Sequence, residues 1–199
     1  MSANSTEEGK RLLRADAISL RKRLSIEDSE IWSRSIQESV VRFPPYLCAS
    51  KVVLYNPLRG EVDTRLIGEN ALSARKMVFY PNPEPIDRPE LILVERNASA
   101  AEIRFDDRDA DSVVFSTGST LIILPGLLFD SSGNRLGRGG GWYDRLLGGP
   151  GLNAVPLALA YEFQIVNEVP VQQWDRPVDY IVTERRIIDC ARERSNLAS

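Results

Sequence analysis

The sequence of 199 residues combines 43% hydrophobic with 27% charged residues, the balance of an ordinary globular protein that can bury one sizeable core. Its formal net charge of −3 and its pI near 5.2 provide no positive field, which argues against nucleic acid as a partner. The chain contains no histidine, and this excludes Ser-His-Asp and Cys-His catalytic sites, histidine acid–base catalysis and imidazole zinc ligands.

Two amphipathic helices are predicted in residues 5–43. Ser5 and Glu8 have the spacing of a capping box at the start of the first helix. Apolar residues then recur every three or four positions, at Leu13, Ala17, Leu20 and Leu24. Beside this stripe, three cations share a narrow arc of the helical wheel: Lys10, Arg14 and Arg21. Their charged ends can therefore line the edge of a cleft.

A second capping box, Ser25 with Asp28, predicts the start of the next helix. This helix must end near Pro44 and Pro45, because proline lacks the amide hydrogen and clashes with the preceding turn. One side of the helix is expected to be buried, with Ile31, Trp32, Ile36, Val40 and Phe43.

Strands and helices alternate through the expected core, residues 50–190. Strands are predicted at 51–55, 77–80, 91–94, 121–124, 155–160 and 180–183. A helix capped by Asp63 or Thr64 is expected to run to about Ala74. Residues 81–118 are rich in proline, aspartate and arginine and are interpreted as loop and edge strand. The order predicts one α/β domain over residues 1–199, a three-layer α/β/α sandwich with a mostly parallel central sheet.

A glycine-rich loop follows the predicted strand at 121–124. Four glycines fall within five positions: Gly137, Gly139, Gly140 and Gly141. Such density is tolerated where φ must be positive or where backbone amides approach a ligand, and a predicted helix follows directly, so the loop suits an anion. Its spacing excludes a Walker A loop and a dinucleotide fingerprint. The alternative is a tight connection between strand and helix; Arg135, Arg138 and Arg145 favour phosphate binding.

The longest pattern in the chain spans this loop. It reads Pro125-Gly126-x-x-Phe129-Asp130-x-x-Gly133-x-Arg135-Leu136-Gly137-x-Gly139-x-Gly141-x-Tyr143-Asp144. Three further segments agree in order and spacing: Lys10-x-x-x-Arg14, Tyr55 with Glu61-x-Asp63-Thr64, and Asp175-x-Pro177-x-Asp179-x-x-x-Thr183-Glu184. Over nearly the whole chain, these segments resemble the signature of the 5-formyltetrahydrofolate cyclo-ligase family.

The resemblance implies a reaction. In this family, ATP phosphorylates the formyl oxygen of 5-formyltetrahydrofolate and N10 attacks the activated carbon. Phosphate then leaves as 5,10-methenyltetrahydrofolate forms, with ADP as the other product. Such chemistry requires the protein to position two substrates and to neutralise charge on phosphoryl oxygens. Mg²⁺, lysine, arginine and backbone amides perform these tasks without histidine.

The resemblance also implies roles for individual residues. Catalysis is assigned to Lys10, Arg14 and Arg145. ATP binding is assigned to Lys10, Arg14, Arg135, Gly137, Arg138, Gly139, Gly140, Gly141, Trp142, Tyr143 and Arg145. Binding of the folate is assigned to Asn56, Glu61, Arg138, Gly139, Gly140, Gly141 and Trp142. The expected cofactor, Mg²⁺, is assigned to Asp144 and Asp175, in keeping with its preference for one or two carboxylates beside phosphates and water.

Each of these residues also has a purely structural interpretation. Asp144 could support the start of its helix, Asp175 could begin a turn before a proline, and Lys10 could belong to a solvated helix face. The agreement of all the segments favours the functional interpretation. Trp142 and Trp174 stand where the family more often has tyrosine and histidine, which leaves the local packing and the metal geometry open.

Two other functions are left open by the sequence. One is a sugar-phosphate isomerase-like enzyme, because glycine loops on α/β sheets also hold simple phosphates. The other is a non-catalytic folate- or nucleotide-binding module. Cys48 and Cys190 form no C-x-x-C pair and are expected to be reduced thiols, and no apolar run reaches membrane-spanning length. We expect a cytoplasmic monomer that acts on small molecules, without nucleic acid or membrane as a partner.

Overall fold

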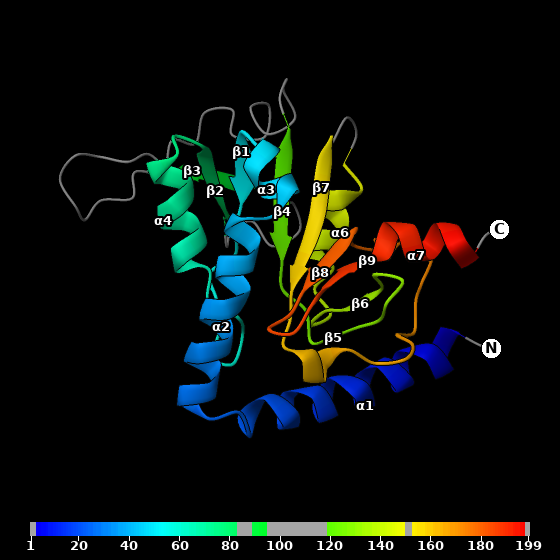
Figure 1. Ribbon diagram of the computed structural model, residues 1–199. Coiled ribbons are helices and arrows are strands. Elements are labelled where there is room, and N and C mark those ends of the chain that lie inside the picture. Colours follow the sequence, from blue (N-terminus) through cyan, green and yellow to red (C-terminus); the bar gives the residue numbers. More distant parts are fainter. Residues whose placement is uncertain (1–2, 83–88, 95–118, 150–152, 198–199) are drawn as a thin grey trace.

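The computed structural model describes residues 3–82, 89–94, 119–149 and 153–197. Its centre is a seven-stranded sheet in the order β3-β2-β1-β4-β7-β8-β9 (Figure 1). The strands are β1 (Lys51–Val53), β2 (Met77–Pro81), β3 (Leu91–Val94), β4 (Thr120–Leu124), β7 (Ala154–Leu159), β8 (Tyr180–Val182) and β9 (Ile187–Asp189). The five central strands pair in parallel, and only the two edge strands, β3 and β9, are antiparallel to their neighbours. The predicted α/β fold with a mostly parallel sheet is confirmed.

Helices cover both faces of the sheet. On β4, Leu121 and Ile123 point into one apolar cluster, whereas Ile122 and Leu124 point into another. Helices α2 (Ile26–Val41), α3 (Pro44–Cys48) and α4 (Arg65–Ser73) contribute to the first cluster; α6 (Trp142–Leu147) and α7 (Cys190–Leu197) contribute to the second. A strand with both faces buried favours apolar residues on both faces, which is why residues 121–124 of β4 form an uninterrupted apolar run.

Helix α1 (Ala3–Lys22) lies across one end of the sheet, beneath the loops that follow the central strands (Figure 1). Ala17 is buried in a small cluster with Leu127 and Leu136, so the helix packs on the connection between β4 and α6. This packing holds the cations of α1 beside that connection.

The connection contains a hairpin that the sequence analysis did not predict, formed by β5 (Leu128–Phe129) and β6 (Arg135–Leu136). Its turn is closed by the buried carboxylate of Asp130, which accepts hydrogen bonds at 3.0 Å from the backbone and side-chain nitrogens of Asn134 and from the amide of Val169. Gly133 has a φ of +84°, a conformation that L side chains rarely adopt. Asp130 and Gly133, which belong to the long sequence pattern, therefore stabilise the turn of this hairpin.

The ends of the first two helices differ from the prediction. Helix α1 begins at Ala3, so Ser5 lies within the helix and not at its cap. At the second box the serine cap is confirmed, since the Ser25 hydroxyl accepts a hydrogen bond from the Asp28 amide at 3.0 Å; the Asp28 carboxylate accepts from the Ser25 hydroxyl and not from its amide. Two residues expected in the core are exposed: Leu20, because the hairpin covers only a narrow stripe of α1, and Ile31, because it faces a cavity.

The strand and helix boundaries shift by one or two residues elsewhere. Strand β1 ends at Val53, although Leu54 and Tyr55 continue as buried chain. Helix α2 ends at Val41, and the two prolines open the short helix α3, where the missing amide hydrogen costs nothing.

Most of the region interpreted as loop and edge strand lies outside the described residues, but β3 is an edge strand as expected. Strand β9, helix α7 and the 3₁₀ turn η1 (Glu162–Gln164) were not predicted. None of the described helices is both long enough and apolar enough to cross a bilayer.

Candidate active site

The candidate site lies at the carboxyl ends of three adjacent strands. Glu61 follows β1, Gly126 follows β4 and Tyr161 follows β7. The chain leaves β1 toward β2 and β3 on one side and later returns to β4 on the other, so the gap between β1 and β4 is a topological switch point. Open α/β sheets bind ligands at such points.

Gly126 is required at its position by close packing. A Cβ atom there would overlap the ring of Phe129 and approach Cγ of Arg135 at 2.9 Å. Without a side chain, the Gly126 carbonyl can accept hydrogen bonds from both Arg21 and Gln164. The Pro-Gly pair after β4 thus brings the backbone close to two polar side chains.

The glycine loop, residues 137–141, joins β6 to α6. Gly139 and Gly141 have φ values of +102° and +63°. The amides of Gly139, Gly140 and Gly141 donate to no acceptor within the described part of the chain. Two of the loop carbonyls accept from arginines: Arg14 Nε donates to Gly137 at 3.1 Å, and Arg145 Nη1 donates to Gly140 at 3.0 Å. Three amides of the loop are therefore available to a ligand, while the carbonyls of Gly137 and Gly140 are already engaged.

A cavity of about 270 Å³ lies over this loop. It brings together all of the predicted ATP-binding residues except Arg145, namely Lys10, Arg14, Arg135, Gly137, Arg138, Gly139, Gly140, Gly141, Trp142 and Tyr143. Both predicted metal ligands, Asp144 and Asp175, line it too. Arg145 is exposed and does not line this cavity.

The two aspartates are each paired with a cation. Lys10 Nζ lies 2.6 Å from Asp175 Oδ2, and Arg135 Nη2 lies 3.0 Å from Asp144 Oδ1. The same Asp144 oxygen accepts a hydrogen bond at 3.1 Å from the amide of Arg176, the residue after Asp175. The two carboxylates are therefore neighbours at one wall of the cavity.

The donor set of this wall fits Mg²⁺ bound together with phosphates. The second oxygen of Asp144 and of Asp175 accepts no hydrogen bond from the described residues. Mg²⁺ takes hard oxygen ligands and is usually held by only one or two carboxylates beside phosphates and water. Consistent with so sparse a site, the described residues contain no group of three or more carboxylate, thiol or imidazole side chains suited to a metal.

Aromatic rings form the base of the glycine loop. The rings of Trp142 and Tyr143 meet edge to face with centroids 4.8 Å apart, and the Arg135 guanidinium lies 5.7 Å from the Tyr143 centroid. Burial raises the pKa of Tyr143, so this phenol stays neutral. Tyr143 anchors the loop to the apolar core.

A second cavity, of about 1140 Å³, lies between α1, α2 and the chain after β1. Among the residues of the described chain that line both cavities are Glu61 and Arg138, which form an ion pair of 3.2 Å. The two cavities therefore meet at this pair. Asn56, which was predicted to bind folate, is exposed and lines neither cavity.

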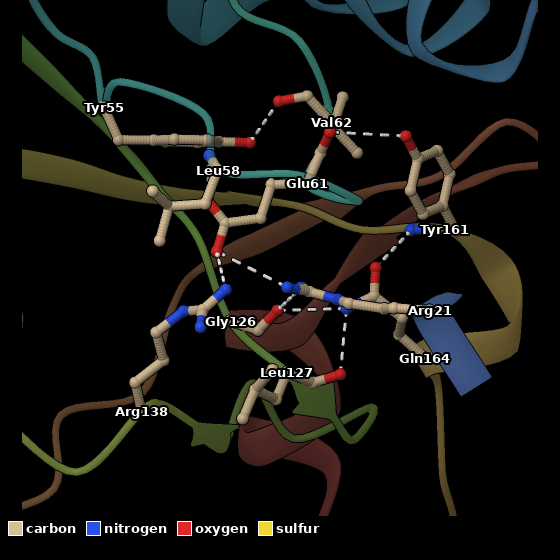
Figure 2. A network of polar contacts seen from close by, with 10 residues as sticks. All are labelled: Arg21, Tyr55, Leu58, Glu61, Val62, Gly126, Leu127, Arg138, Tyr161 and Gln164. Atoms are coloured by element: carbon tan, nitrogen blue, oxygen red, sulfur yellow. Dashed lines mark hydrogen bonds and ion pairs between the residues drawn. The ribbon is translucent and has the colours of Figure 1, made fainter. Parts of the chain in front are cut away.

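Glu61 is the centre of a buried polar network (Figure 2). Its Oε1 atom lies 3.4 Å from Arg21 Nη1 and 3.2 Å from Arg138 Nη2, and its Oε2 atom accepts a hydrogen bond from the Leu58 amide at 3.0 Å. Arg21 is itself fixed by the Gly126 carbonyl. Burial lowers the pKa of Arg21, and the charge of Glu61 opposes this shift.

Tyr161 supports the backbone of this network (Figure 2). Its hydroxyl lies 3.4 Å from the Glu61 carbonyl and 3.0 Å from the hydroxyls of Ser29 and Ser33 in the first half of α2. The Tyr161 amide donates to Gln164 at 2.9 Å, and Gln164 donates to the carbonyls of Gly126 and Leu127. Loops after three different strands are thereby held together.

Several residues of the site were missed from the sequence. Arg21 was predicted to line a cleft edge with Lys10 and Arg14, and it lines the larger cavity, but its pairing with Glu61 was not predicted. Gln172, which accepts a hydrogen bond from Lys10 at 3.1 Å, precedes Asp175 by three residues and carried no recognisable pattern. Tyr161 and Gln164 lay in a segment with no motif.

Comparison with known proteins agrees with this geometry. The family model of the 5-formyltetrahydrofolate cyclo-ligase family matches residues 6–184. The chain belongs to this family. Among curated cyclo-ligases, that of Escherichia coli K12 is 29% identical and that of Mus musculus 29% identical; the alignments cover 84% and 92% of this chain, and 96% and 98% of those proteins.

Solved structures of cyclo-ligase relatives agree as well. The NMR structure of Aquifex aeolicus 5,10-methenyltetrahydrofolate synthetase is 30% identical, with a TM-score of 0.75 and coverage of 91% of this chain and 92% of that one. The fold is also shared with a 5,10-methenyltetrahydrofolate synthetase from Mycoplasma pneumoniae, at 21% identity and a TM-score of 0.70, over 88% of this chain and 98% of that one. The family resemblance inferred from the motifs is confirmed.

Proposed function

We propose that this chain catalyses the ATP-dependent conversion of 5-formyltetrahydrofolate to 5,10-methenyltetrahydrofolate, with release of ADP and phosphate. One structural observation supports this proposal independently of family membership. A cavity lined by cations and loop amides meets a larger cavity at the Glu61–Arg138 pair, so two substrates can be brought together there.

The smaller cavity suits the phosphates of ATP. Lys10, Arg14 and Arg135 supply positive charge, and the amides of the glycine loop supply donors that are already oriented. Fixed donors of this kind stabilise charge on a transferring phosphoryl group because they need no reorganisation during the reaction. Arg145, whose guanidinium donates to the Gly140 carbonyl, would reach the nucleotide from beside the loop.

Asp144 and Asp175 would hold the Mg²⁺ that accompanies the nucleotide. When bound, this ion neutralises the negative charge that develops on the phosphoryl oxygens. The partners of the two aspartates, Arg135 and Lys10, are themselves candidate phosphate ligands. They can therefore turn from carboxylate to phosphate when the nucleotide enters.

The larger cavity suits the reduced folate. Its volume is ample for a drug-sized heterocycle with a side chain. Exposed apolar side chains at its wall, Ile26, Ile31 and Leu58, offer contact to aromatic rings. The Glu61 carboxylate, buried at the inner end, is an acceptor for the ring N–H groups of a pterin. A direct contact from Asn56 is not part of the proposal.

The residues then divide the reaction between them. Glu61 orients the pterin so that the formyl oxygen faces the smaller cavity, where it attacks the terminal phosphorus of ATP and releases ADP. Lys10, Arg14 and Arg138 stabilise the charge on the phosphoryl oxygens. N10 then attacks the activated carbon and phosphate leaves. The residues named here orient the substrates and neutralise charge, so the reaction does not require histidine.

The test is a turnover assay with purified protein, 5-formyltetrahydrofolate and MgATP, followed by the absorbance of the methenyl product. Absorbance should rise only when ATP is present, and Lys10→Ala should abolish the rise. A flat trace under all conditions contradicts the proposal. Binding of both ligands without product would identify a non-catalytic module, and a thermal shift with sugar phosphates but not with MgATP would favour the isomerase-like alternative.

The proposal also includes the setting of the enzyme. We expect a monomer in the cytoplasm that handles only small molecules. Nucleic acid is not expected as a partner, because the net charge of −3 gives no general attraction to it. Light scattering of the purified protein should give a mass near 22.3 kDa, and a mass of twice that value would contradict the monomer.

A further inference from the structure

Two guanidinium groups share a single oxygen of Glu61. Arg21 and Arg138 both approach Oε1, at 3.4 Å and 3.2 Å, while the other oxygen is held by a backbone amide. The group as a whole carries one more positive than negative charge. Burial lowers the pKa of Arg21, and repulsion from the like charge of Arg138 adds to this lowering, so the departure of Arg138 would remove an unfavourable contact.

The two arginines are not held equally. The side chain of Arg21 is only 6% exposed, and it is also bound by the Gly126 carbonyl (Figure 2). The side chain of Arg138 is 49% exposed, and its described hydrogen bond is the one to Glu61. Water can solvate the half-exposed guanidinium of Arg138 when it leaves, whereas the buried carboxylate of Glu61 stays paired with Arg21. Arg138 is therefore the partner that can leave.

Arg138 can also reach the other cavity. It lines both cavities, and it stands between Gly137 and Gly139 in the glycine loop. Glycine on either side lowers the steric barrier to backbone rotation. A small change in the loop can thus carry the guanidinium from the carboxylate of Glu61 to an anion above the loop amides.

We propose that Arg138 exchanges partners during the cycle: it leaves Glu61 for the phosphates when the nucleotide binds, and Glu61, still held by Arg21, becomes free to bind the N–H groups of the pterin. A triphosphate attracts a guanidinium more strongly than a singly charged carboxylate does. Nucleotide occupancy of the smaller cavity then raises the affinity of the larger cavity for folate. By linkage, folate raises the affinity for nucleotide by the same factor.

This inference rests on the proposed function, since it assigns the two cavities to nucleotide and folate. It adds the residue that couples the two cavities, Arg138, and the sign of the coupling: each ligand strengthens the binding of the other. In the full-length wild-type protein, a saturating, non-hydrolysable ATP analogue with Mg²⁺ should lower the Kd for 5-formyltetrahydrofolate by about tenfold, a coupling of ordinary size. Isothermal titration with each ligand, alone and in the presence of the other, measures this factor in both directions.

Arg138→Gln is the decisive variant. It should bind folate more tightly than wild type when nucleotide is absent, because Glu61 is already free, and added nucleotide analogue should then change that Kd less than twofold. Arg138→Lys, which keeps the charge, should restore part of the coupling. The matched control is Arg11→Gln, which breaks an arginine–glutamate pair on the solvent side of α1, away from both cavities, and should couple like wild type.

The possible outcomes separate the two proposals. Coupling of equal size in wild type and Arg138→Gln, or weaker folate binding by the nucleotide-free variant, overturns the exchange while turnover still supports the proposed function. Absence of coupling between nucleotide and folate in wild type also overturns the exchange. If the wild-type protein binds neither ligand, the proposed function fails and the exchange fails with it.

Discussion

Lys10 and Asp175, which are 165 residues apart in the sequence, form an ion pair of 2.6 Å that joins helix α1 to the segment before β8. The lysine side chain is 5% exposed and the aspartate 20% exposed, so water screens the pair only partly. The pair is at once a tether for the first helix and part of the candidate site.

We expect Lys10→Met to lower the free energy of unfolding by about 1–3 kcal/mol, because Asp175 is left with an uncompensated, mostly buried charge. Urea unfolding followed by circular dichroism measures the change. The control is Arg11→Met, which breaks an exposed pair and should change stability by less than about 0.5 kcal/mol. Equal effects from the two substitutions would show that the pair does not tether α1.

Gly126→Ala should lower stability by about 1–3 kcal/mol, because the new Cβ overlaps the Phe129 ring and displaces Arg135. The same substitution at Gly9 is the control, since a Cβ there meets nothing within 4 Å and alanine favours the helix by up to about 1 kcal/mol. Thermal unfolding should move in opposite directions for the two variants. A neutral Gly126→Ala would mean that the hairpin can yield at this point.

Tyr161→Phe should raise KM for the folate several-fold and leave kcat nearly unchanged, because the lost hydroxyl supports the backbone of Glu61 and the first half of α2. Its cost in stability should be about 1 kcal/mol. Tyr46→Phe removes a buried hydroxyl that contacts Asn70, outside both cavities, and should cost similar stability without changing KM. Parallel steady-state kinetics distinguish the two; a KM effect in both would indicate a general loss of structure.

Asp144→Asn should weaken the binding of MgATP while leaving the fold intact, because the amide oxygen can still accept from the Arg176 backbone but the charge is gone. The thermal shift produced by MgATP should fall to less than half of the wild-type value, and excess EDTA should have the same effect on wild type. Asp28→Asn, at the solvent-exposed start of α2, is the control and should keep the full shift. An unchanged shift for Asp144→Asn would remove this residue from the metal site.

Stability should fall as the pH rises above about 9, because burial raises the pKa of the Cys190 thiol to about 12 and that of Tyr46 to about 12. The unfolded chain loses these protons near the ordinary values of 9.0 and 10.0, whereas the folded chain retains them. The stabilisation is complete below the unfolded pKa values and is lost as the pH rises toward the folded ones. Urea unfolding at several pH values should show a decline of up to about 1.4 kcal/mol per pH unit for each group. Cys190→Ala should flatten this decline between pH 9 and 11; an identical slope would contradict it.

The elements that the sequence predicted well are those with a strong local pattern. The apolar run of β4 could be recognised because both faces of this strand are buried. The serine cap of α2 could be recognised because it depends on a single local hydrogen bond. The hairpin β5–β6 was missed because each strand has two residues, too few to show alternation. Ile31 was placed in the core because periodicity identifies an apolar face without saying what covers it.

The site could be predicted to a similar extent. The sequence motif identified nearly every residue that lines the smaller cavity, since most of these residues lie close together in sequence or on one helix face. The junction at Glu61 depends on Arg21, Gly126 and Tyr161, which reach it from α1 and from the ends of two different strands. Their convergence follows from strand order, which no local spacing encodes.

The position of α1 also bears on how the protein is made. This helix is synthesised before the hairpin, the glycine loop and the segment that contains Asp175, and these three parts of the chain supply many of its described contacts. Until translation has passed that segment, α1 lacks part of the surface on which it docks. The smaller cavity can therefore be completed only after the segment that contains Asp175 has been made, because Lys10 and Arg14 of α1 form part of its wall.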